Sequence, residues 1–289
     1  MQPRHKLTAF IKLTRPPFVL VEVLSCVLLM ITFQKGFYNL ALLILAAATV
    51  IVISAGSAAT NDYFDRESDS LTHPERPIPS GQVSPAGVAQ FAALTFLIGL
   101  GLSLMINPVA FGIVAGNVVL FILYPRVFKR LSGFMSNLVM GYLGATVALF
   151  AGAVIFQTFN VDTLSFVGMI AVAVIGFNVL KDALTLEGDL KIGYPTLAVK
   201  RGIRTTVIVG ALFLLFTAIS LPVPYLVGVV GVAYLFPVAV AACVFLFSSL
   251  SLLRESNVQN IRRRLRISTL CWSVLPIALI INALFSYTW

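Results

Sequence analysis

The sequence predicts an all-α integral membrane protein in which nine transmembrane helices form one bundle. The first observation is composition: 59% of the 289 residues are hydrophobic and 11% are charged, whereas about a quarter of the residues in a soluble domain are charged. The second is a series of apolar stretches long enough to cross a bilayer, which takes roughly 20 residues. The third is the one-sided placement of Lys and Arg, which orients helices in a membrane.

The apolar stretches follow one another with short polar or proline-containing connections. They cover residues 17–34, 38–60, 86–106, 108–125, 132–156, 163–182, 204–221, 223–249 and 267–287. Asn107-Pro108 and Leu221-Pro222 divide runs that are otherwise too long, because proline ends a helix at or before the preceding residue. The connections are too short to hold a separate folded unit, so we expect residues 1–289 to form a single domain.

Nineteen of the twenty Lys and Arg residues fall on one side of the predicted membrane. If the N-terminus is cytoplasmic, the segments on that side are 1–16, 61–85, 126–131, 183–203 and 250–266. These segments and their membrane edges hold every Lys and Arg except Lys35. The bias predicts a multi-pass protein of the cell membrane with the N-terminus in the cytoplasm and the C-terminus outside. It also accounts for the net charge of +9 through topology and contact with anionic membrane lipid, so we expect no nucleic-acid partner.

Acidic residues concentrate in two of the cytoplasmic connections. Residues 61–85, after the second span, and 182–203, after the sixth, hold eight of the eleven acids. Asp62, Asp65 and Asp69 are spaced to share one face of a helix. Three carboxylates on one face repel unless a cation lies between them, and Mg²⁺ prefers oxygen ligands, with substrate phosphates completing its shell. The first connection therefore predicts a metal-bridged phosphate site.

The second connection repeats part of this pattern. Asp182 and Asp189 have the same outer spacing as Asp62 and Asp69, and Thr185 occupies the middle position. Four spans separate the two connections, which indicates a duplicated four-helix arrangement with one acidic cluster in each half. Helical bundles commonly build metal sites from facing helices. The two clusters together predict a site for Mg²⁺ and a diphosphate.

Basic residues near the acids are candidates for binding the diphosphate: Arg66, Arg76, Lys129, Arg130, Lys181 and Lys191. An apolar bundle accommodates a long hydrocarbon tail. A substrate with a diphosphate head and a lipid tail is a prenyl diphosphate, which we expect to be the donor. Diphosphate held by a metal is a good leaving group, because the charge that develops on it is neutralised.

Two motifs resemble the signatures of the UbiA superfamily of intramembrane prenyltransferases. The first is Asn61-Asp62-x-x-Asp65-x-x-x-Asp69 followed by Arg76-Pro77-Ile78-Pro79-Ser80-Gly81, and the second runs from Lys181-Asp182 through Glu187-Gly188-Asp189 to Gly193. Tyr124-Pro125 with Lys129-Arg130 is similar to the short basic loop that follows the fourth helix in that family. The likeness covers nearly the whole chain and includes the nine-helix count.

The resemblance implies one UbiA-type domain built around a central cavity that is open sideways to lipid. It implies that Asp62, Asp65, Asp69, Asp182 and Asp189 bind Mg²⁺ and act in catalysis, with Asn61 assisting at the diphosphate. Ionisation then gives an allylic cation that a lipophilic acceptor captures. The residues of the first motif most resemble those of the archaeal ether-lipid branch of the superfamily. In that branch a geranylgeranyl group is transferred to the free hydroxyl of geranylgeranylglyceryl phosphate.

Alternatives stay open for the reaction. An aromatic or tetrapyrrole acceptor, as in quinone and chlorophyll synthesis, is the close rival. A secondary transporter also suits clustered acids and half-repeats, although its acids lie near the bilayer midplane, whereas these lie at cytoplasmic helix ends.

Two residues affect the details of the site. Many superfamily members have a third acid where this chain has Thr185, so we expect the first cluster to hold metal more firmly. Glu22 lies inside the first span. An acid within a span is a candidate functional residue by default; the alternative is that Glu22 pairs with a polar neighbour.

Overall fold

The computed structural model confirms that the protein is all-helical. It describes residues 3–35 and 39–286, and the side chains of these residues except 3–7, 68, 71, 72 and 286. Within this part of the chain, nine helical segments are long and apolar enough to cross a membrane: Pro16–Gln34, Leu40–Glu67, Pro85–Ile106, Pro108–Leu131, Gly133–Phe156, Val161–Leu184, Leu197–Leu226, Val232–Arg254 and Val258–Phe285. The protein is therefore a multi-pass membrane protein.

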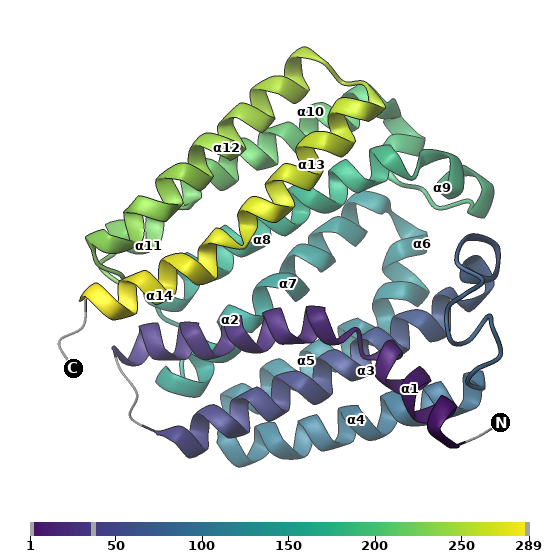
Figure 1. Ribbon diagram of the computed structural model, residues 1–289, viewed down its shortest axis with the longest axis horizontal. Helices are drawn as coiled ribbons and strands as arrows, with labels where there is room; N and C mark the ends of the chain where they lie inside the picture. Colours follow the sequence, from purple (N-terminus) through teal and green to yellow (C-terminus); the bar gives the residue numbers. More distant parts are fainter. Residues whose placement is uncertain (1–2, 36–38, 287–289) are drawn as a thin grey trace. The chain divides into compact units, whose positions relative to one another are not determined.

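Figure 1 labels most of the helices that make up these segments. In chain order they are α1 (Pro3–Leu13), α2 (Pro16–Gln34), α3 (Leu40–Thr72), α4 (Pro85–Ile106), α5 (Pro108–Leu123), the π-helix η1 (Tyr124–Phe128), α6 (Lys129–Leu131), α7 (Gly133–Phe156), α8 (Val161–Leu184), α9 (Leu186–Ile192), α10 (Leu197–Ser220), α11 (Val223–Leu226), the 3₁₀ turn η2 (Val232–Tyr234), α12 (Leu235–Arg254), α13 (Val258–Trp272) and α14 (Val274–Ser286). Polar side chains directly before several helices accept hydrogen bonds from the first turn, as Asn107 does from the Ala110 N–H at 2.8 Å. Such caps satisfy amides that have no partner inside the helix.

Some boundaries differ from those predicted. Helix α3 continues to Thr72, because residues 61–72 contain neither glycine nor proline and Pro74 is the first residue that cannot continue it. Residues 258–266, expected in a cytoplasmic connection, form the first part of α13. Arginine is a good helix former, and Ile261 and Leu265 are buried there. The predicted span at 223–249 is interrupted at Gly228, whose φ is +80°.

The chain divides into two compact units. The first contains Met1–Val27 and Asn39–Val127, and the second contains Leu28–Tyr38 and Phe128–Trp289. In the first unit α3 packs against α4 and α5, and α1 packs against α3. In the second unit α8 packs against α7, α10 and α13, and α12 packs against α10 and α13. Each unit contains one of the acidic clusters.

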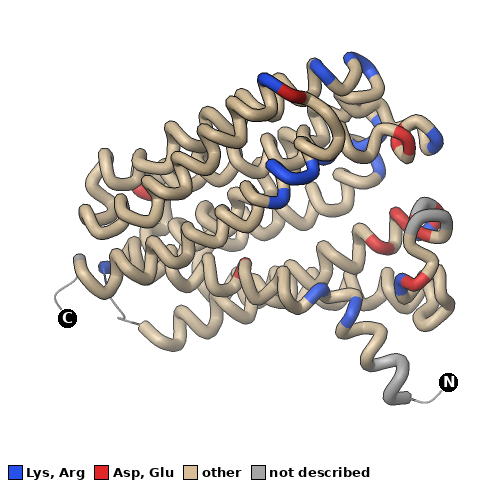
Figure 2. The backbone as a smooth tube through the Cα atoms, turned by 45° about the horizontal axis from the view of Figure 1, so that its top comes forward, with Lys and Arg blue, Asp and Glu red and all other residues tan. Residues whose placement is uncertain are grey.

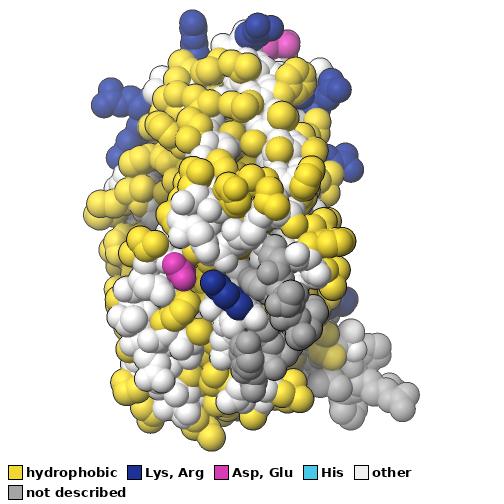
Figure 3. Space-filling model, turned by 90° about the vertical axis from the view of Figure 1, so that its left-hand side faces the viewer, with side chains coloured by type: hydrophobic (Ala, Val, Ile, Leu, Met, Phe, Trp, Pro, Cys, Tyr) yellow, Lys and Arg dark blue, Asp and Glu magenta, His cyan; other side chains and the backbone are white. Residues whose placement is uncertain are grey.

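Charged and apolar residues are segregated in a way that suits a lipid environment. Figure 2 shows that most charged residues lie at helix ends and connections: at the C-terminal end of α3 and just after it in the first unit, and around α9 and the α12–α13 turn in the second. Large apolar side chains such as Leu97, Phe236 and Phe285 are exposed, and hydrophobic side chains cover much of the face in Figure 3. Extended exposed apolar surface of this kind marks a membrane-contacting protein.

Close packing of α3 on α4 leads to a stability prediction. A Cβ atom added at Gly99 overlaps the side chain of Ile53, whereas nothing lies within 4 Å of one added at Gly101 on the same helix. We predict that Gly99→Ala lowers the free energy of unfolding by about 1–3 kcal/mol, the usual cost of overpacking. Gly101→Ala leaves it unchanged or raises it, because alanine favours helix. Thermal unfolding in detergent measures both, and equal effects would contradict this packing.

Candidate functional site

Helix α3 carries the first acidic cluster at its C-terminal end. Asp62 and Asp69 are buried, at 6% and 5% exposure, and Asp65 is partly exposed. The helix stays regular through this region and ends where the His73 N–H donates to the Asp69 carbonyl at 2.7 Å. The predicted face of three aspartates therefore exists, and two of its carboxylates lie out of solvent.

Two arginines pair with the buried carboxylates. Arg76 Nη1 lies 2.6 Å from Asp69 Oδ2 and 3.7 Å from Asp62 Oδ1. Arg15 Nη2 donates a hydrogen bond to Asp62 Oδ1. A buried carboxylate is costly unless it is paired and hydrogen-bonded, so these guanidinium groups stabilise the cluster in the absence of metal.

The proline-rich run after α3 fixes the position of Arg76. Ile78 is buried in a cluster with Leu13, Ala59 and Val83. The Ser80 N–H donates to the Arg76 carbonyl at 3.0 Å, and Gly81 has a φ of +73°, a conformation that glycine adopts at little cost. The Arg76–Gly81 motif is thus a folded anchor that holds one cation beside the α3 carboxylates.

Sequence reasoning missed Arg15, which it assigned to membrane orientation. Arg15 lies between α1 and α2 and has a φ of +50°, uncommon for a residue other than glycine. Pro16 follows it, and a residue before proline is kept out of the α region. The signal that could have identified it is the Arg15-Pro16-Pro17 junction at the membrane edge, where the backbone is constrained next to a charge.

The remaining polar residues of the first motif lie differently from one another. The Arg66 side chain contacts residues of its own helix, α3. Its Nη1 donates to the Tyr63 carbonyl at 2.7 Å, and its Nη2 lies 3.7 Å from the Glu67 carboxylate. Asn61 is partly exposed beside Asp62. The structure therefore brings Arg76 to the aspartates and directs Arg66 elsewhere.

The second cluster is held by neutral hydrogen-bond donors. Asn137 Nδ2, from α7, donates to Asp182 Oδ2 on α8 at 2.9 Å. Thr185 Oγ1 donates to Asp189 Oδ2 at 2.8 Å. Interhelical hydrogen bonding is the usual role of an asparagine in a span, and for Asn137 the partner is a predicted site residue. Thr185, at the position of the missing third acid, orients Asp189.

Residues 193–196 close the second cluster from one side. The Gly193 and Tyr194 N–H groups both donate to the Asp189 carbonyl at 2.9 Å. The Gly133 N–H donates to the Pro195 carbonyl at 3.0 Å, and a Cβ on Gly133 would overlap the Thr196 backbone. Burial raises the pKa of Asp189, against hydrogen bonds from Thr185 and Thr196 and the charge of Lys129, which lower it.

Of the basic candidates in the second unit, Lys129 is the one beside Asp189. Its Nζ lies 4.9 Å from the centre of the Tyr194 ring, and its charge acts on Asp189. Arg130, Lys181 and Lys191 are exposed, and none of them enters an ion pair in the described part of the chain. Lys181 is adjacent in sequence to Asp182, and its charge acts on that carboxylate.

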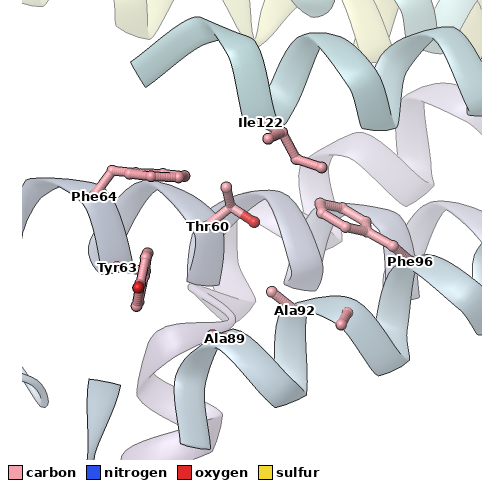
Figure 4. Close-up of a pocket in the computed structure, with 8 residues that line it drawn as sticks. Thr60, Tyr63, Phe64, Ala89, Ala92, Phe96 and Ile122 are labelled. Atoms are coloured by element: carbon pink, nitrogen blue, oxygen red, sulfur yellow. The ribbon is translucent and has the colours of Figure 1, made fainter. Parts of the chain in front are cut away.

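A cavity of about 180 Å³ lies in the first unit between α3, α4 and α5. Figure 4 shows Thr60 and Phe64 of α3, Phe96 of α4 and Ile122 of α5 around this space. Positions 60 and 64 lie on a different face of α3 from positions 62, 65 and 69, given 3.6 residues per turn. The cavity is therefore separate from the aspartates, and the central lipid-open cavity expected from the resemblance stays a prediction.

The first cluster fits a divalent cation in its chemistry. Among the described residues, no three His, Cys, Asp or Glu side chains are grouped closely enough to hold a metal ion. One cationic nitrogen, Arg76 Nη1, nevertheless contacts both Asp62 and Asp69. Mg²⁺ is commonly bound by one or two carboxylates, with water and substrate phosphates completing its coordination. The two carboxylates are therefore close enough to share a cation, and their oxygens suit Mg²⁺.

The described residues thus form nine candidate membrane spans, with one aspartate cluster in each of the two units. Residues 23–274 match the UbiA prenyltransferase family. The chain belongs to this family, whose members transfer prenyl groups, and the predicted family and enzyme class are confirmed. The match covers both aspartate clusters.

Several relatives are named digeranylgeranylglyceryl phosphate synthase. The chain is 38% identical to the one from Methanopyrus kandleri over 208 residues, which cover 71% of this chain and 75% of the relative. It is 33% identical to that from Methanoregula boonei over 240 residues, or 83% and 84% of the two chains.

Solved structures have the same fold. A structure of digeranylgeranylglyceryl phosphate synthase superposes with a TM-score of 0.83 at 25% identity and covers 96% of this chain and 98% of that one. A UbiA homologue from Archaeoglobus fulgidus bound to GPP and Mg²⁺ has a TM-score of 0.65 at 18% identity, with coverage of 94% and 99%. The UbiA membrane fold is thereby confirmed.

The arginine pairing leads to a second prediction. Arg76→Ala removes the cation that Asp62 and Asp69 share, so we expect the free energy of unfolding without Mg²⁺ to fall by about 1–3 kcal/mol. Added Mg²⁺ then stabilises the variant more than the unchanged protein, because it replaces the lost charge and binds the folded state. Thermal unfolding with and without Mg²⁺ measures this.

Arg66→Ala is the matched control, since Arg66 contacts only Tyr63 and the exposed Glu67 among the described contacts. An equal response to Mg²⁺ in the two variants would contradict the shared-cation interpretation.

Proposed function

We propose that the protein catalyses Mg²⁺-dependent transfer of a geranylgeranyl group from geranylgeranyl diphosphate to geranylgeranylglyceryl phosphate, in the synthesis of ether lipids of the cell membrane. One observation carries the proposal: a prenyltransferase-family chain retains both aspartate motifs and is 33–38% identical, over most of its length, to relatives named for this product. The GPP and Mg²⁺ bound to the A. fulgidus homologue support the donor class and the metal.

In this proposal the carboxylates of Asp62, Asp65, Asp69, Asp182 and Asp189 bind Mg²⁺, and Asn61 assists at the diphosphate. Mg²⁺, when bound, neutralises the charge that develops on the leaving diphosphate. The burial of Asp62 and Asp69 strengthens their interaction with a cation, because the local dielectric constant is low.

The basic residues have a second role once metal takes the carboxylates. Arg76 and Lys129, which now neutralise aspartates, become available to bind phosphate oxygens. Charge-assisted hydrogen bonds from guanidinium to phosphate are strong and often bidentate. Arg66, Arg130, Lys181 and Lys191 are proposed as further diphosphate contacts, and an acceptor that itself carries a phosphate needs additional cations of this kind.

The orientation in the membrane is part of the proposal. Lys and Arg lie almost entirely in the segments predicted to face the cytoplasm, so the positive-inside rule places both aspartate clusters on that side. The N-terminus is then cytoplasmic and the C-terminus outside. Water-soluble Mg²⁺ reaches the carboxylates from the cytoplasm, and the two lipid substrates enter from the membrane.

We predict that Asp62→Ala and Asp182→Ala each reduce diphosphate release by on the order of 100-fold or more, because a group that stabilises charge in the transition state is lost. Size-exclusion chromatography in detergent checks that both variants remain folded. Glu67→Ala is the control, since Glu67 is exposed and points away from the aspartate face. Full turnover by either aspartate variant with Mg²⁺ present would overturn the assignment.

The acceptor is tested by supplying the purified protein with labelled geranylgeranyl diphosphate and a panel of glycerol-phosphate, phenolic and tetrapyrrole acceptors, and identifying the product by mass. We expect the ether of geranylgeranylglyceryl phosphate, its loss on chelation and its return with added Mg²⁺. Transfer to an aromatic or tetrapyrrole acceptor alone would replace the ether-lipid function with quinone or chlorophyll-type synthesis. Transfer that persists in chelator would exclude the metal-dependent mechanism.

A further inference from the structure

Glu22 is an acid inside a membrane-spanning helix that the proposed metal and diphosphate chemistry does not use. It is the one acidic residue of α2, and its carboxylate accepts a hydrogen bond from the Ser54 hydroxyl of α3. Acids in spans are rare and costly, and those present commonly act in function. A hydrogen bond from serine orients the carboxylate but does not neutralise its charge.

The contacts of α2 with α3 place Glu22 on the same side of α3 as the first aspartate cluster. Arg15, directly before α2, pairs with Asp62, and Glu22 of α2 pairs with Ser54. The chain thus advances seven residues from Arg15 to Glu22 while their partners run back eight residues along α3, which is the register of two antiparallel neighbours. Ser54 and Asp62 are eight residues apart on α3, which is a rise of about 12 Å, so Glu22 lies about that far along α3 from the Arg15–Asp62 contact.

This separation suits a group that acts on the reacting carbon. If the diphosphate is bound at Asp62 and the prenyl chain extends into the span, the P–O–P–O–C1 backbone covers about half of this distance, and C1 lies between Asp62 and Glu22. The other described acids of the first unit are the three candidate metal ligands and the exposed Glu67 and Glu75. Glu22 is therefore the described first-unit carboxylate that is not exposed and has no metal assigned to it.

We propose that Glu22 is the catalytic base that receives the proton of the acceptor hydroxyl, and that Ser54 positions its carboxylate. The inference rests on the proposed prenyl transfer to an alcohol. As the acceptor oxygen forms its bond to C1, the C1–O bond of the donor breaks and its electron pair leaves with the diphosphate. The acceptor O–H bond breaks, and its proton passes to Glu22. General-base assistance of this kind contributes roughly 10²–10⁴-fold to a rate.

The test compares two products of one variant. Glu22→Gln keeps the size of the side chain and can still accept from Ser54, but it cannot take a proton at neutral pH. With labelled geranylgeranyl diphosphate, Mg²⁺ and geranylgeranylglyceryl phosphate, we expect ether formation to fall on the order of 100-fold or more. The KM for the donor stays close to that of the unchanged protein, and the remaining diphosphate release shifts toward geranylgeraniol formed by water. Glu22→Asp restores part of the ether formation.

The controls separate this role from a structural one. Ser54→Ala removes only the orienting hydrogen bond and is expected to reduce ether formation less than Glu22→Gln. Ether formation by Glu22→Gln at the unchanged rate overturns the inference, as does a loss of donor binding in parallel with the loss of ether. If the unchanged protein forms no ether, the proposed acceptor is wrong. The same comparison is then made with the acceptor that the panel identifies, which also loses a proton, and an unchanged rate there overturns the role of Glu22.

Discussion

The first half of the candidate site depends on the pairing of buried carboxylates with arginines. Asp62 and Asp69 lie at the end of a membrane-spanning helix with almost no solvent contact, where an unpaired negative charge is costly. Arg15 and Arg76 pair with them from segments before α2 and after α3. This requirement explains why a positive-φ junction precedes α2 and why a buried proline-rich anchor follows α3. Both features bring a guanidinium to a fixed position on α3.

In both clusters polar partners stabilise the carboxylates, but the chemical groups of these partners differ. The first is balanced by two full positive charges that can exchange with a metal ion. The second is held by neutral donors, Asn137 and Thr185, with the charge of Lys129 nearby. Where a third carboxylate is common in the family, Thr185 contributes a hydroxyl that occupies an oxygen of Asp189. The second cluster therefore offers less negative charge to a metal ion, and the first is expected to bind it more firmly.

Much of the architecture could be predicted from the sequence because a bilayer imposes simple rules. Span length and proline positions predicted nine spans, and the described residues form nine helical segments long and apolar enough to cross a membrane; positions 38 and 287 of the predicted spans lie outside the described residues. The i, i+3, i+7 spacing predicted the shared face of the aspartates. Helix ends were less predictable. The apolar run stops near residue 60, but α3 continues to Thr72 because hydrogen bonding, and not hydrophobicity, sets where a helix ends.

Two partners of the acids, Arg15 and Asn137, could not be predicted, because they come from distant parts of the chain. Arg15 is 47 residues from Asp62, and Asn137 is 45 residues from Asp182. Arg15 resembled an orientation signal, and Asn137 resembled an ordinary interhelical polar residue. Only the fold distinguishes a cation that faces lipid headgroups from one that neutralises a buried carboxylate.

The most direct measurement is the anomalous scattering of Mn²⁺ in a crystal of the protein with a non-reactive prenyl diphosphate analogue. Mn²⁺ accepts the same oxygen ligands as Mg²⁺, and its anomalous signal gives both position and occupancy. We predict an ion beside Asp62 and Asp69 at higher occupancy than any ion beside Asp182 and Asp189, with Arg76 moved from the carboxylates toward a phosphate. Equal occupancy at the two clusters, or an ion-free first cluster with Arg76 still paired to Asp69, would contradict the account.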